Sequence, residues 1–246
     1  VSFLPDALKN DPRFFICAGG YLPTITQDTF LDRFPDVDFI IVGEGDLAIV
    51  KAVKSLSAGK DISEVENVIS RGKNGKTEHN FHLLTPEELD ALYPPDWSIL
   101  QSPEDRLFGK KALFDTAHGC PGWCKFCGIH KFFNEAFSNN RYLLPLKALW
   151  WRPRSAQKVV DEMEYLHREF GITGFDIVDD DFIGNNPGRA RQIAEEIIKR
   201  DLKVSFWILT RSDAVTEENI EVFSLLKKAG LKQVFLGVES NDLDQL

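Results

Sequence analysis

The chain has 246 residues, with 29 Lys and Arg against 38 Asp and Glu and a formal net charge of -9 at pH 7. A chain of this length forms one large domain or two modest ones, and its negative charge offers no general attraction to nucleic acid or anionic membranes. No apolar run is long enough to span a bilayer and the first residues do not resemble a signal peptide, so we expect a cytoplasmic protein without a membrane or nucleic-acid partner.

Residues 1–82 alternate between strand and helix patterns, which is typical of an open α/β fold. The predicted strands cover 13–20 and 37–45, and the predicted helices cover 26–34 and 46–56. We expect the second helix to bury Leu47, Val50 and Val53 along one face. The pair Asn74-Gly75 predicts a hairpin turn that closes this unit.

Residues 83–110 contain prolines and acids without a sustained hydrophobic period, and are predicted to be a linker. Residues 111–246 then return to strict alternation. The predicted strands cover 111–117, 174–182, 203–211 and 232–240. Helix caps are expected at Ser155, Asn186 and Thr216. Four strands separated by three helices predict a parallel sheet, which we expect to curl into a partial barrel of the TIM type.

Three of the four cysteines lie in the segment "HGCPGWCKFCG", directly after the first strand of this series. Cys120, Cys124 and Cys127 are therefore predicted to share one loop at the carboxyl end of the sheet, where α/β active sites lie. Three thiolates can each hold one iron of a 4Fe-4S cluster and leave the fourth iron open. The alternative is a structural zinc site completed by His118 or His130.

The fourth cysteine, Cys17, stands alone inside the apolar run "FFICAGG" and is expected to be a buried small side chain.

The spacing CxxxCxxC after a first barrel strand, with the aromatic Phe126 before the last cysteine, resembles the signature of the radical S-adenosylmethionine (radical SAM) enzymes. The resemblance implies that Cys120, Cys124 and Cys127 hold a 4Fe-4S cluster whose open iron is chelated by S-adenosylmethionine. Reductive cleavage of this molecule then releases a 5'-deoxyadenosyl radical. In such a scheme the cofactors carry the hard chemistry and the protein supplies placement and exclusion of water.

The segments at the ends of the later predicted strands resemble segments of the same family. The segment "VDDDF" implies that Asp179 and Asp180 lie near the ammonium group of S-adenosylmethionine, although the same acids could cap a strand-to-helix turn. The segment "LTRSD" implies that Arg211 pairs with the methionine carboxylate. The segment "GVES" implies that Glu239 and Ser240 contact the ribose.

The first unit contains "GEGDLA", which matches the GxGxxA pattern of dinucleotide sites. We disfavour that interpretation because Glu44 and Asp46 would place carboxylates where a pyrophosphate must bind. The unit resembles instead the C-terminal half of a cobalamin-binding, Rossmann-like domain. The implied cofactor-lining residues are Gly19, Gly20, Gly43, Glu44 and Gly45. The alternative is that these glycines only turn strands into helices.

The connection between Cys127 and the first helix of the second series is long and rich in aromatic and basic residues. Trp150, Trp151, Arg152 and Arg154 would face a planar or anionic substrate, or the corrin ring. The alternative is that the tryptophans pack against the first domain.

The resemblance implies a cobalamin-dependent radical SAM enzyme, most readily a methyltransferase acting on an unactivated carbon or phosphorus centre. Alternatives from the same branch are cyclisation, rearrangement or ring contraction. A transfer-RNA methylthiotransferase is less favoured because it needs three further cysteines, and a zinc-binding module is the non-enzymatic rival. The implied partners are a small-molecule or natural-product substrate and an electron donor such as flavodoxin or ferredoxin. Because the chain begins at Val1 and ends at Leu246 inside a helical pattern, we expect a fragment of a longer protein.

Overall fold

The computed structural model forms two compact units, which are described separately. The described residues are 14–71, 81–97, 110–122, 124–129, 132 and 151–240. The first unit consists of Val1–Leu84 and Cys124–Leu144, and the second of Thr85–Trp123 and Pro145–Leu246. The chain therefore passes from one unit to the other within the cysteine segment.

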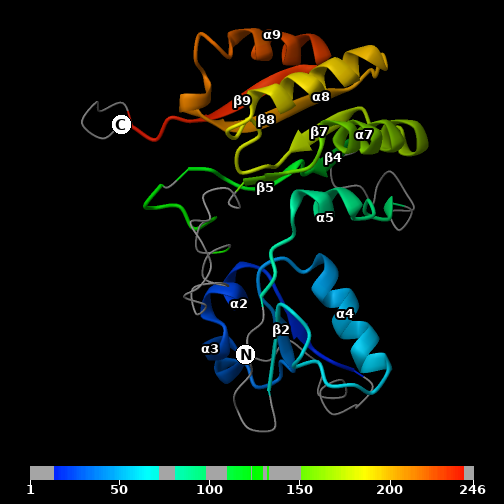
Figure 1. Cartoon of the computed structure of the whole chain (residues 1–246), viewed down its shortest axis with the longest axis vertical. Coiled ribbons are helices and arrows are strands. Elements are labelled where there is room, and N and C mark those ends of the chain that lie inside the picture. The colour runs from blue at the N-terminus through cyan, green and yellow to red at the C-terminus, as the bar shows by residue number, and fades with distance from the viewer. Residues whose placement is uncertain are drawn as a thin grey trace. The chain divides into compact units, whose positions relative to one another are not determined.

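The first unit is built on a small mixed sheet in the order β1-β2-β3 (Figure 1). Its strands are β1 (Cys17–Ala18), β2 (Phe39–Ile41) and β3 (Val68–Ser70). β1 runs parallel to β2, and β3 runs antiparallel to it. All three residues of β2 are buried because helices cover both faces of the sheet.

The helices of this unit are α2 (Tyr21–Thr26), α3 (Asp28–Arg33) and α4 (Asp46–Ser57). The sequence predicted one helix over 26–34, but the backbone of Gln27 has a φ of 44°, which ends α2 before α3 begins. The hairpin turn at Asn74-Gly75 lies outside the described residues.

The predicted buried face of α4 is wrong at Val50 and Val53, while Leu47 is partly buried. Ala48 and Ala52 face the core, whereas Val50 is 46% exposed and Val53 is 52% exposed. Small alanines let the helix lie close to the sheet, and this turns the larger residues outward. The expectation that Cys17 is buried is also wrong, because β1 is an outer strand of this sheet and leaves the residue exposed.

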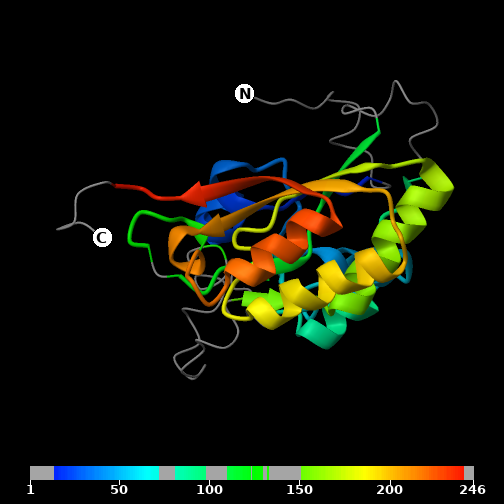
Figure 2. The same ribbon diagram turned by 90° about the horizontal axis from the view of Figure 1, so that it is seen from above.

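The second unit contains a parallel sheet whose strands pair in chain order, β4-β7-β8-β9 (Figure 1). Its strands are β4 (Lys111–Phe114), β7 (Gly174–Ile177), β8 (Ser205–Arg211) and β9 (Leu231–Gly237). Its helices are α7 (Ala156–Phe170), α8 (Pro187–Lys199) and α9 (Ile220–Ala229). Figure 2 shows the helices on one face of the sheet, where they share a single apolar core with it. The prediction of a parallel α/β sheet is confirmed.

Helix caps explain most of these boundaries. Ser155 accepts a hydrogen bond from the Lys158 N–H at 3.3 Å, and Asn186 accepts one from the Arg189 N–H at 3.1 Å. The prediction for Thr216 is wrong, because its hydroxyl accepts from the Asn219 N–H at 3.3 Å in the turn that precedes α9.

The range predicted as an irregular linker contains a helix, α5 (Pro86–Ala91). Thr85 and Glu88 form a capping box, and Pro86 occupies the first turn. Asp90 then accepts a hydrogen bond from the Ser155 N–H at 2.8 Å, which fixes α5 to the start of α7 within the second unit.

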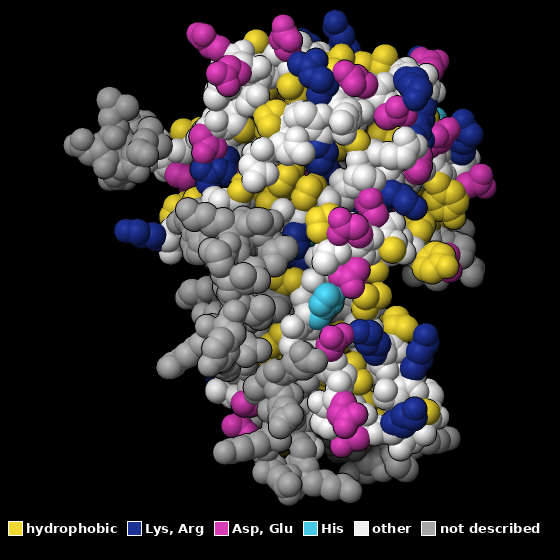
Figure 3. Space-filling model, in the orientation of Figure 1, with side chains coloured by type: hydrophobic (Ala, Val, Ile, Leu, Met, Phe, Trp, Pro, Cys, Tyr) yellow, Lys and Arg dark blue, Asp and Glu magenta, His cyan; other side chains and the backbone are white. Residues whose placement is uncertain are grey.

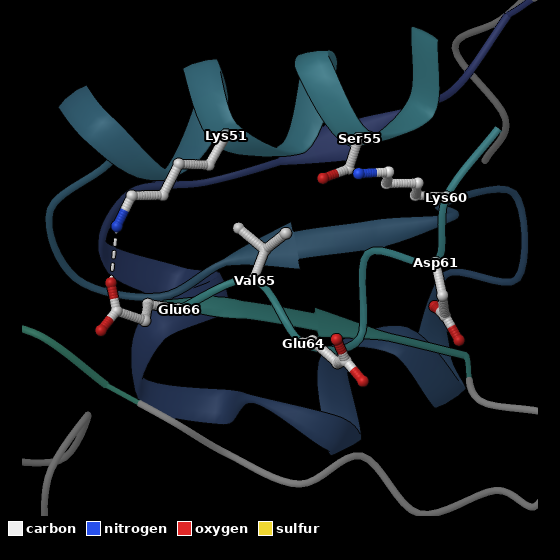
Figure 4. A pocket seen from close by; sticks show the side chains of 7 residues that line it. All are labelled: Lys51, Ser55, Lys60, Asp61, Glu64, Val65 and Glu66. Carbon is white, nitrogen blue, oxygen red and sulfur yellow. Dashed lines mark hydrogen bonds and ion pairs between the residues drawn. The ribbon is translucent and has the colours of Figure 1, made fainter. Parts of the chain in front are cut away.

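A polar hollow of about 680 Å³ lies beside α4 in the first unit (Figure 4). Its lining includes Lys51 and Glu66, which form an ion pair at 2.6 Å. On the molecular face drawn in Figure 3, acidic and basic side chains are interspersed, unlike the single-sign surface that nucleic-acid binding uses. None of the helices in the described part of the chain is long and apolar enough to cross a bilayer.

Candidate functional site

The three cysteines lie between the two strands of a short antiparallel ribbon, whose first strand follows β4. The ribbon pairs β5 (Ala117–Gly119) with β6 (Trp151–Pro153). Cys120 follows β5, is half-buried, and its sulfur accepts from the Gly122 N–H at 3.4 Å. Burial raises the pKa of this thiol to about 11; the Gly122 N–H opposes the rise, and the carboxylate of Asp181 adds to it. Binding of iron or zinc at Cys120 therefore has to displace a firmly held proton.

Cys124 and Cys127 lie in the part of the segment that belongs to the first unit. The Cys127 N–H donates to the Cys124 carbonyl at 3.0 Å, which makes a tight turn between them. Beyond this turn, the Tyr21 hydroxyl donates to the Gly128 carbonyl at 3.2 Å and so ties the segment to α2. Phe126 between the two cysteines is 72% exposed, and its contact with S-adenosylmethionine stays a prediction.

The chemistry of the three cysteines fits an iron–sulfur cluster. All four cysteines are free thiols, and Cys120, Cys124 and Cys127 are each half-buried within eight positions. Within the described ranges, no three His, Cys, Asp or Glu side chains converge as a ready-made metal site. The ligand set therefore remains a prediction from the spacing. His118 Nε2 lies 3.4 Å from the Asp115 carboxylate, and His130 lies outside the described residues.

Arg211 is placed against the cysteine segment within the second unit. It is the last residue of β8, and its Nε donates to Asp213 at 3.0 Å while its Nη2 donates to the other oxygen of the same carboxylate. A Cβ atom added to Gly122 would lie 1.9 Å from Arg211 Nη1 and 3.4 Å from the Cys120 sulfur. The guanidinium group therefore lies on Gly122 and next to Cys120. The pairing of Arg211 with a ligand carboxylate stays a prediction.

The two acids predicted beside the ammonium group have different surroundings. Asp179 is 2% exposed and accepts hydrogen bonds from the N–H and hydroxyl of Thr116 and from the Ala117 N–H at 3.1 Å. Burial raises its pKa to about 6, and the hydrogen bonds from Thr116 only partly oppose this rise. Its carboxylate thus supports the corner between β4 and β5, which is a structural role different from the expected capping of a strand-to-helix turn.

Asp180 is exposed, and partial burial of its carboxyl raises its pKa while the nearby His118 lowers it. Its charge acts on Cys120 as well, so the two groups lie in one neighbourhood. Of the two predicted acids, Asp180 is the one whose carboxylate is open to a ligand. Its contact with an ammonium group stays a prediction.

Sequence reasoning assigned no role to the third acid of this run. Asp181 is 1% exposed, and its Oδ1 accepts from the Thr210 hydroxyl at 2.7 Å and from the Gly184 N–H at 3.1 Å. It therefore links β8 to the turn that follows β7, and its charge also raises the pKa of Cys120. The sequence signal was present in three consecutive acids, but periodicity does not tell which of them points inward.

The last predicted ligand contacts follow β9. Glu239 is exposed and adopts a φ of 59°, and its Oε1 would lie 3.3 Å from a Cβ atom on Gly237. The Ser240 N–H donates to the Val238 carbonyl at 2.6 Å, which forms a tight turn. This turn follows the carboxyl end of β9, and the ribose contacts stay predictions.

The aromatic and basic residues before α7 contradict their predicted roles. Trp151 is 5% exposed, its Nε1 donates to the Asp181 carbonyl at 2.8 Å, and its ring covers Gly184. Arg152 is 1% exposed, and Arg154 forms an ion pair with Glu162. These side chains pack inside the second unit, where β6 pairs with β5, and the Trp151 ring is covered by residues of that unit. Trp150 lies outside the described residues.

In the first unit, the predicted cofactor-lining residues lie where β1 and β2 end. Gly20 precedes α2 with a φ of 90°, and Gly43 has a φ of 71° and donates to the Thr24 hydroxyl at 3.0 Å. Gly19 is exposed, and Gly45 precedes α4. Because β1 and β2 are parallel, these loops emerge at the same edge of the sheet.

Glu44 differs from these glycines. It is 8% exposed, and its Oε2 accepts a hydrogen bond from the Leu84 N–H at 2.9 Å. Asn67 completes this attachment, because its side chain accepts from the His82 N–H at 2.6 Å and donates to the His82 carbonyl at 2.9 Å. Glu44 thus anchors the segment that leaves this unit, and its contact with cobalamin stays a prediction.

Comparison with known proteins identifies relatives along nearly the whole chain. No protein-family model matches it. It is 30% identical to an anaerobic magnesium-protoporphyrin IX monomethyl ester cyclase of Rubrivivax gelatinosus, over 95% of the chain and 40% of that protein. It is 28% identical to an uncharacterized methyltransferase of Pyrococcus horikoshii, over 92% of the chain and 45% of that protein. It is 26% identical to the hopanoid C-3 methylase of Methylococcus capsulatus, over 96% of the chain and 41% of that protein.

Solved structures share the fold. The cobalamin-dependent S-adenosylmethionine radical enzyme OxsB, with aqua-cobalamin bound, superposes with a TM-score of 0.71 at 25% identity, over 94% of this chain and 32% of OxsB. The radical S-adenosylmethionine methyltransferase TsrM from Kitasatospora setae, with cobalamin and a [4Fe-4S] cluster bound, gives a TM-score of 0.65 at 16% identity, over 91% of this chain and 41% of TsrM.

The chain thus spans less than half the length of the relatives it matches. The cysteine spacing, the parallel α/β sheet and these relatives agree with one another: along nearly its whole length the chain is similar to enzymes that include a cobalamin-dependent S-adenosylmethionine radical enzyme.

Proposed function

We propose that this chain is the cofactor-binding part of a radical SAM enzyme that transfers a methyl group with the help of cobalamin. One observation carries the proposal: Cys120, Gly122, Arg211 and Asp180 are neighbours in the second unit, where the parallel strands end. This neighbourhood combines a metal-binding thiol, a cation for a carboxylate and an anion for an ammonium group, which are the groups that the methionine part of S-adenosylmethionine requires.

In this proposal Cys120, Cys124 and Cys127 hold a 4Fe-4S cluster. A cluster held there would supply the electron for the reductive cleavage of S-adenosylmethionine to methionine and a 5'-deoxyadenosyl radical. Arg211 binds the carboxylate of S-adenosylmethionine and Asp180 its ammonium group. Glu239 and Ser240, after β9, orient the ribose. The protein thus fixes the direction of the radical and keeps water from it.

We propose that the three-stranded sheet is the second half of a Rossmann-like cobalamin domain over 1–82, and that residues 111–246 form part of a TIM-type barrel, with 83–110 between them. Glycines at the ends of β1 and β2 support the first assignment, because they let a nucleotide-like group approach the backbone. Strand pairing in chain order supports the second.

A second reaction has specific support. Three of the similar proteins are named magnesium-protoporphyrin ester cyclases, and one of them is 30% identical to this chain. Cyclisation therefore stands beside methyl transfer as a candidate reaction on a small-molecule substrate. S-adenosylmethionine with a deuterated methyl group separates the two, because a methyltransferase passes the label to its product and a cyclase does not.

The core of the proposal is tested by anaerobic reconstitution of the chain with iron and sulfide. We expect about four irons and four sulfides per chain, and formation of 5'-deoxyadenosine after addition of dithionite and S-adenosylmethionine. Cys120→Ala, Cys124→Ala and Cys127→Ala should each abolish deoxyadenosine formation. Cys17→Ala, which removes the exposed fourth thiol, is the matched control and should retain it. A colourless protein with one tightly bound zinc would refute the proposal.

A further inference from the structure

Asp213 holds the guanidinium group of Arg211 in one orientation. It lies in the short 3-10 turn Ser212–Ala214 that follows β8. Its Oδ1 accepts from Arg211 Nε at 3.0 Å, and its Oδ2 accepts from Arg211 Nη2. This paired geometry fixes both the position and the plane of the guanidinium group.

The remaining nitrogen of the guanidinium lies against the cysteine segment. A Cβ atom at Gly122 would be 1.9 Å from Nη1 and 3.0 Å from the central carbon of the guanidinium, so the group rests directly on the Gly122 backbone. The same Cβ position is 3.4 Å from the Cys120 sulfur. Asp213 thus contacts Arg211 through Nε and Nη2, while Nη1 is held next to Cys120.

The ion pair between Arg211 and Asp213 contributes little to the stability of the fold. The Asp213 side chain is 63% exposed and that of Arg211 is 33% exposed, and ion pairs with this much solvent contact stabilise a fold only slightly. The pair does restrict a long side chain that otherwise populates many rotamers. A ligand that binds Arg211 then loses less conformational entropy on binding.

We propose that Asp213 is a positioning residue that orients Arg211 toward the carboxylate of S-adenosylmethionine. The inference rests on the proposed function, because it needs that ligand to bind beside Cys120. Gly122 is needed for the same orientation of Arg211, because only a residue without a side chain leaves room for the guanidinium at this point.

The test measures the dissociation constant of S-adenosylmethionine by equilibrium dialysis with the full, reconstituted chain. Asp213→Ala should weaken binding about tenfold, the cost of roughly one charge-assisted hydrogen bond that is no longer well aligned. Arg211→Ala should weaken binding at least as much, and the double variant no more than Arg211→Ala, because Asp213 acts only through Arg211. The methyl ester of S-adenosylmethionine, which lacks the carboxylate charge, should bind wild type and Asp213→Ala equally.

The matched control is Asp201→Asn. Asp201 pairs with Lys203 at the same two-residue spacing, before the other end of β8, and is comparably exposed. Its φ of 51° suits asparagine as well as aspartate, so this variant should bind S-adenosylmethionine like wild type. Gly122→Ala should weaken binding of S-adenosylmethionine as Asp213→Ala does, because the new methyl group must displace the Arg211 guanidinium. Iron content is measured for every variant, to establish that each retains its cluster.

The outcomes separate this inference from the proposed function. Wild-type affinity in Asp213→Ala, additive losses in the double variant, or an equal loss for the methyl ester would each overturn the positioning role while the proposed function stands. A reconstituted wild-type chain that does not bind S-adenosylmethionine would overturn both.

Discussion

Replacing Asp179 by asparagine should change how the stability of the second unit depends on pH. Asp179 is almost fully buried, and its pKa is about 6 in the folded chain against an ordinary value of 3.8. Between these two values the folded chain binds more protons than the unfolded chain. The free energy of unfolding of the wild type therefore falls as the pH rises from about 4 to about 6.

The size of the effect follows from the two pKa values. The shift from 3.8 to about 6 amounts to about 3 kcal/mol at 1.36 kcal/mol per pH unit. Asparagine fits the same contacts: its carbonyl can accept from the N–H groups of Thr116 and Ala117, and its amide can donate to the Thr116 hydroxyl. Because asparagine does not titrate, and the unfolded carboxyl is already more than half ionised at pH 4, Asp179→Asn should gain about 2.5 kcal/mol of this relative to wild type between pH 4 and pH 7.

Tryptophan fluorescence is suited to this measurement because all five tryptophans of the chain belong to the second unit. Urea unfolding at pH 4, 5, 6 and 7 gives the free energy of unfolding for wild type and variant at each pH. The reasoning fails if the difference between them is the same at every pH, or if it changes in favour of the wild type as the pH rises.

Three further predictions concern other positions. Asp180→Asn should weaken binding of S-adenosylmethionine about tenfold and leave stability within about 0.5 kcal/mol; unchanged affinity in equilibrium dialysis would remove Asp180 from the site. Gly184→Ala should destabilise the second unit by about 2–4 kcal/mol, because the new Cβ would lie 2.2 Å from the Trp151 ring and the backbone φ is 56°; a loss below about 0.5 kcal/mol in tryptophan-detected unfolding would contradict this. Glu44→Ala should cost about 1–3 kcal/mol by leaving the buried Leu84 N–H without its acceptor, and faster hydrogen exchange at that amide is the measurement that checks it.

The second unit could be predicted from the sequence because its boundaries depend on local signals. Ser155 and Asn186 cap their helices through side-chain hydrogen bonds, and Gly230 ends α9 with a φ of 122° that other residues avoid. The orientation of α4 could not be predicted in this way. Hydrophobicity favoured Val50 and Val53 as its buried face, whereas close packing on the sheet placed alanines there.

The candidate site shows the same division between local and tertiary information. The spacing of the cysteines is a local pattern, and Arg211 was named because the segment "LTRSD" resembles a segment of the radical SAM enzymes. The roles of Asp179 and Trp151 depend on which neighbour each side chain meets, and both turned inward to backbone groups of the second unit. Asp213 was missed because a pair two residues apart beyond a strand has no periodic signature.

The pairing of strands in chain order has a consequence for the order in which the second unit is assembled. Each strand of the sheet after the first pairs with a strand that precedes it in the chain, so its partner has already been synthesised when it leaves the ribosome. The cysteine segment follows β4, the first strand made, whereas Arg211 ends β8, the third. Cys120 is therefore synthesised well before Arg211, whose guanidinium lies beside it in the folded unit.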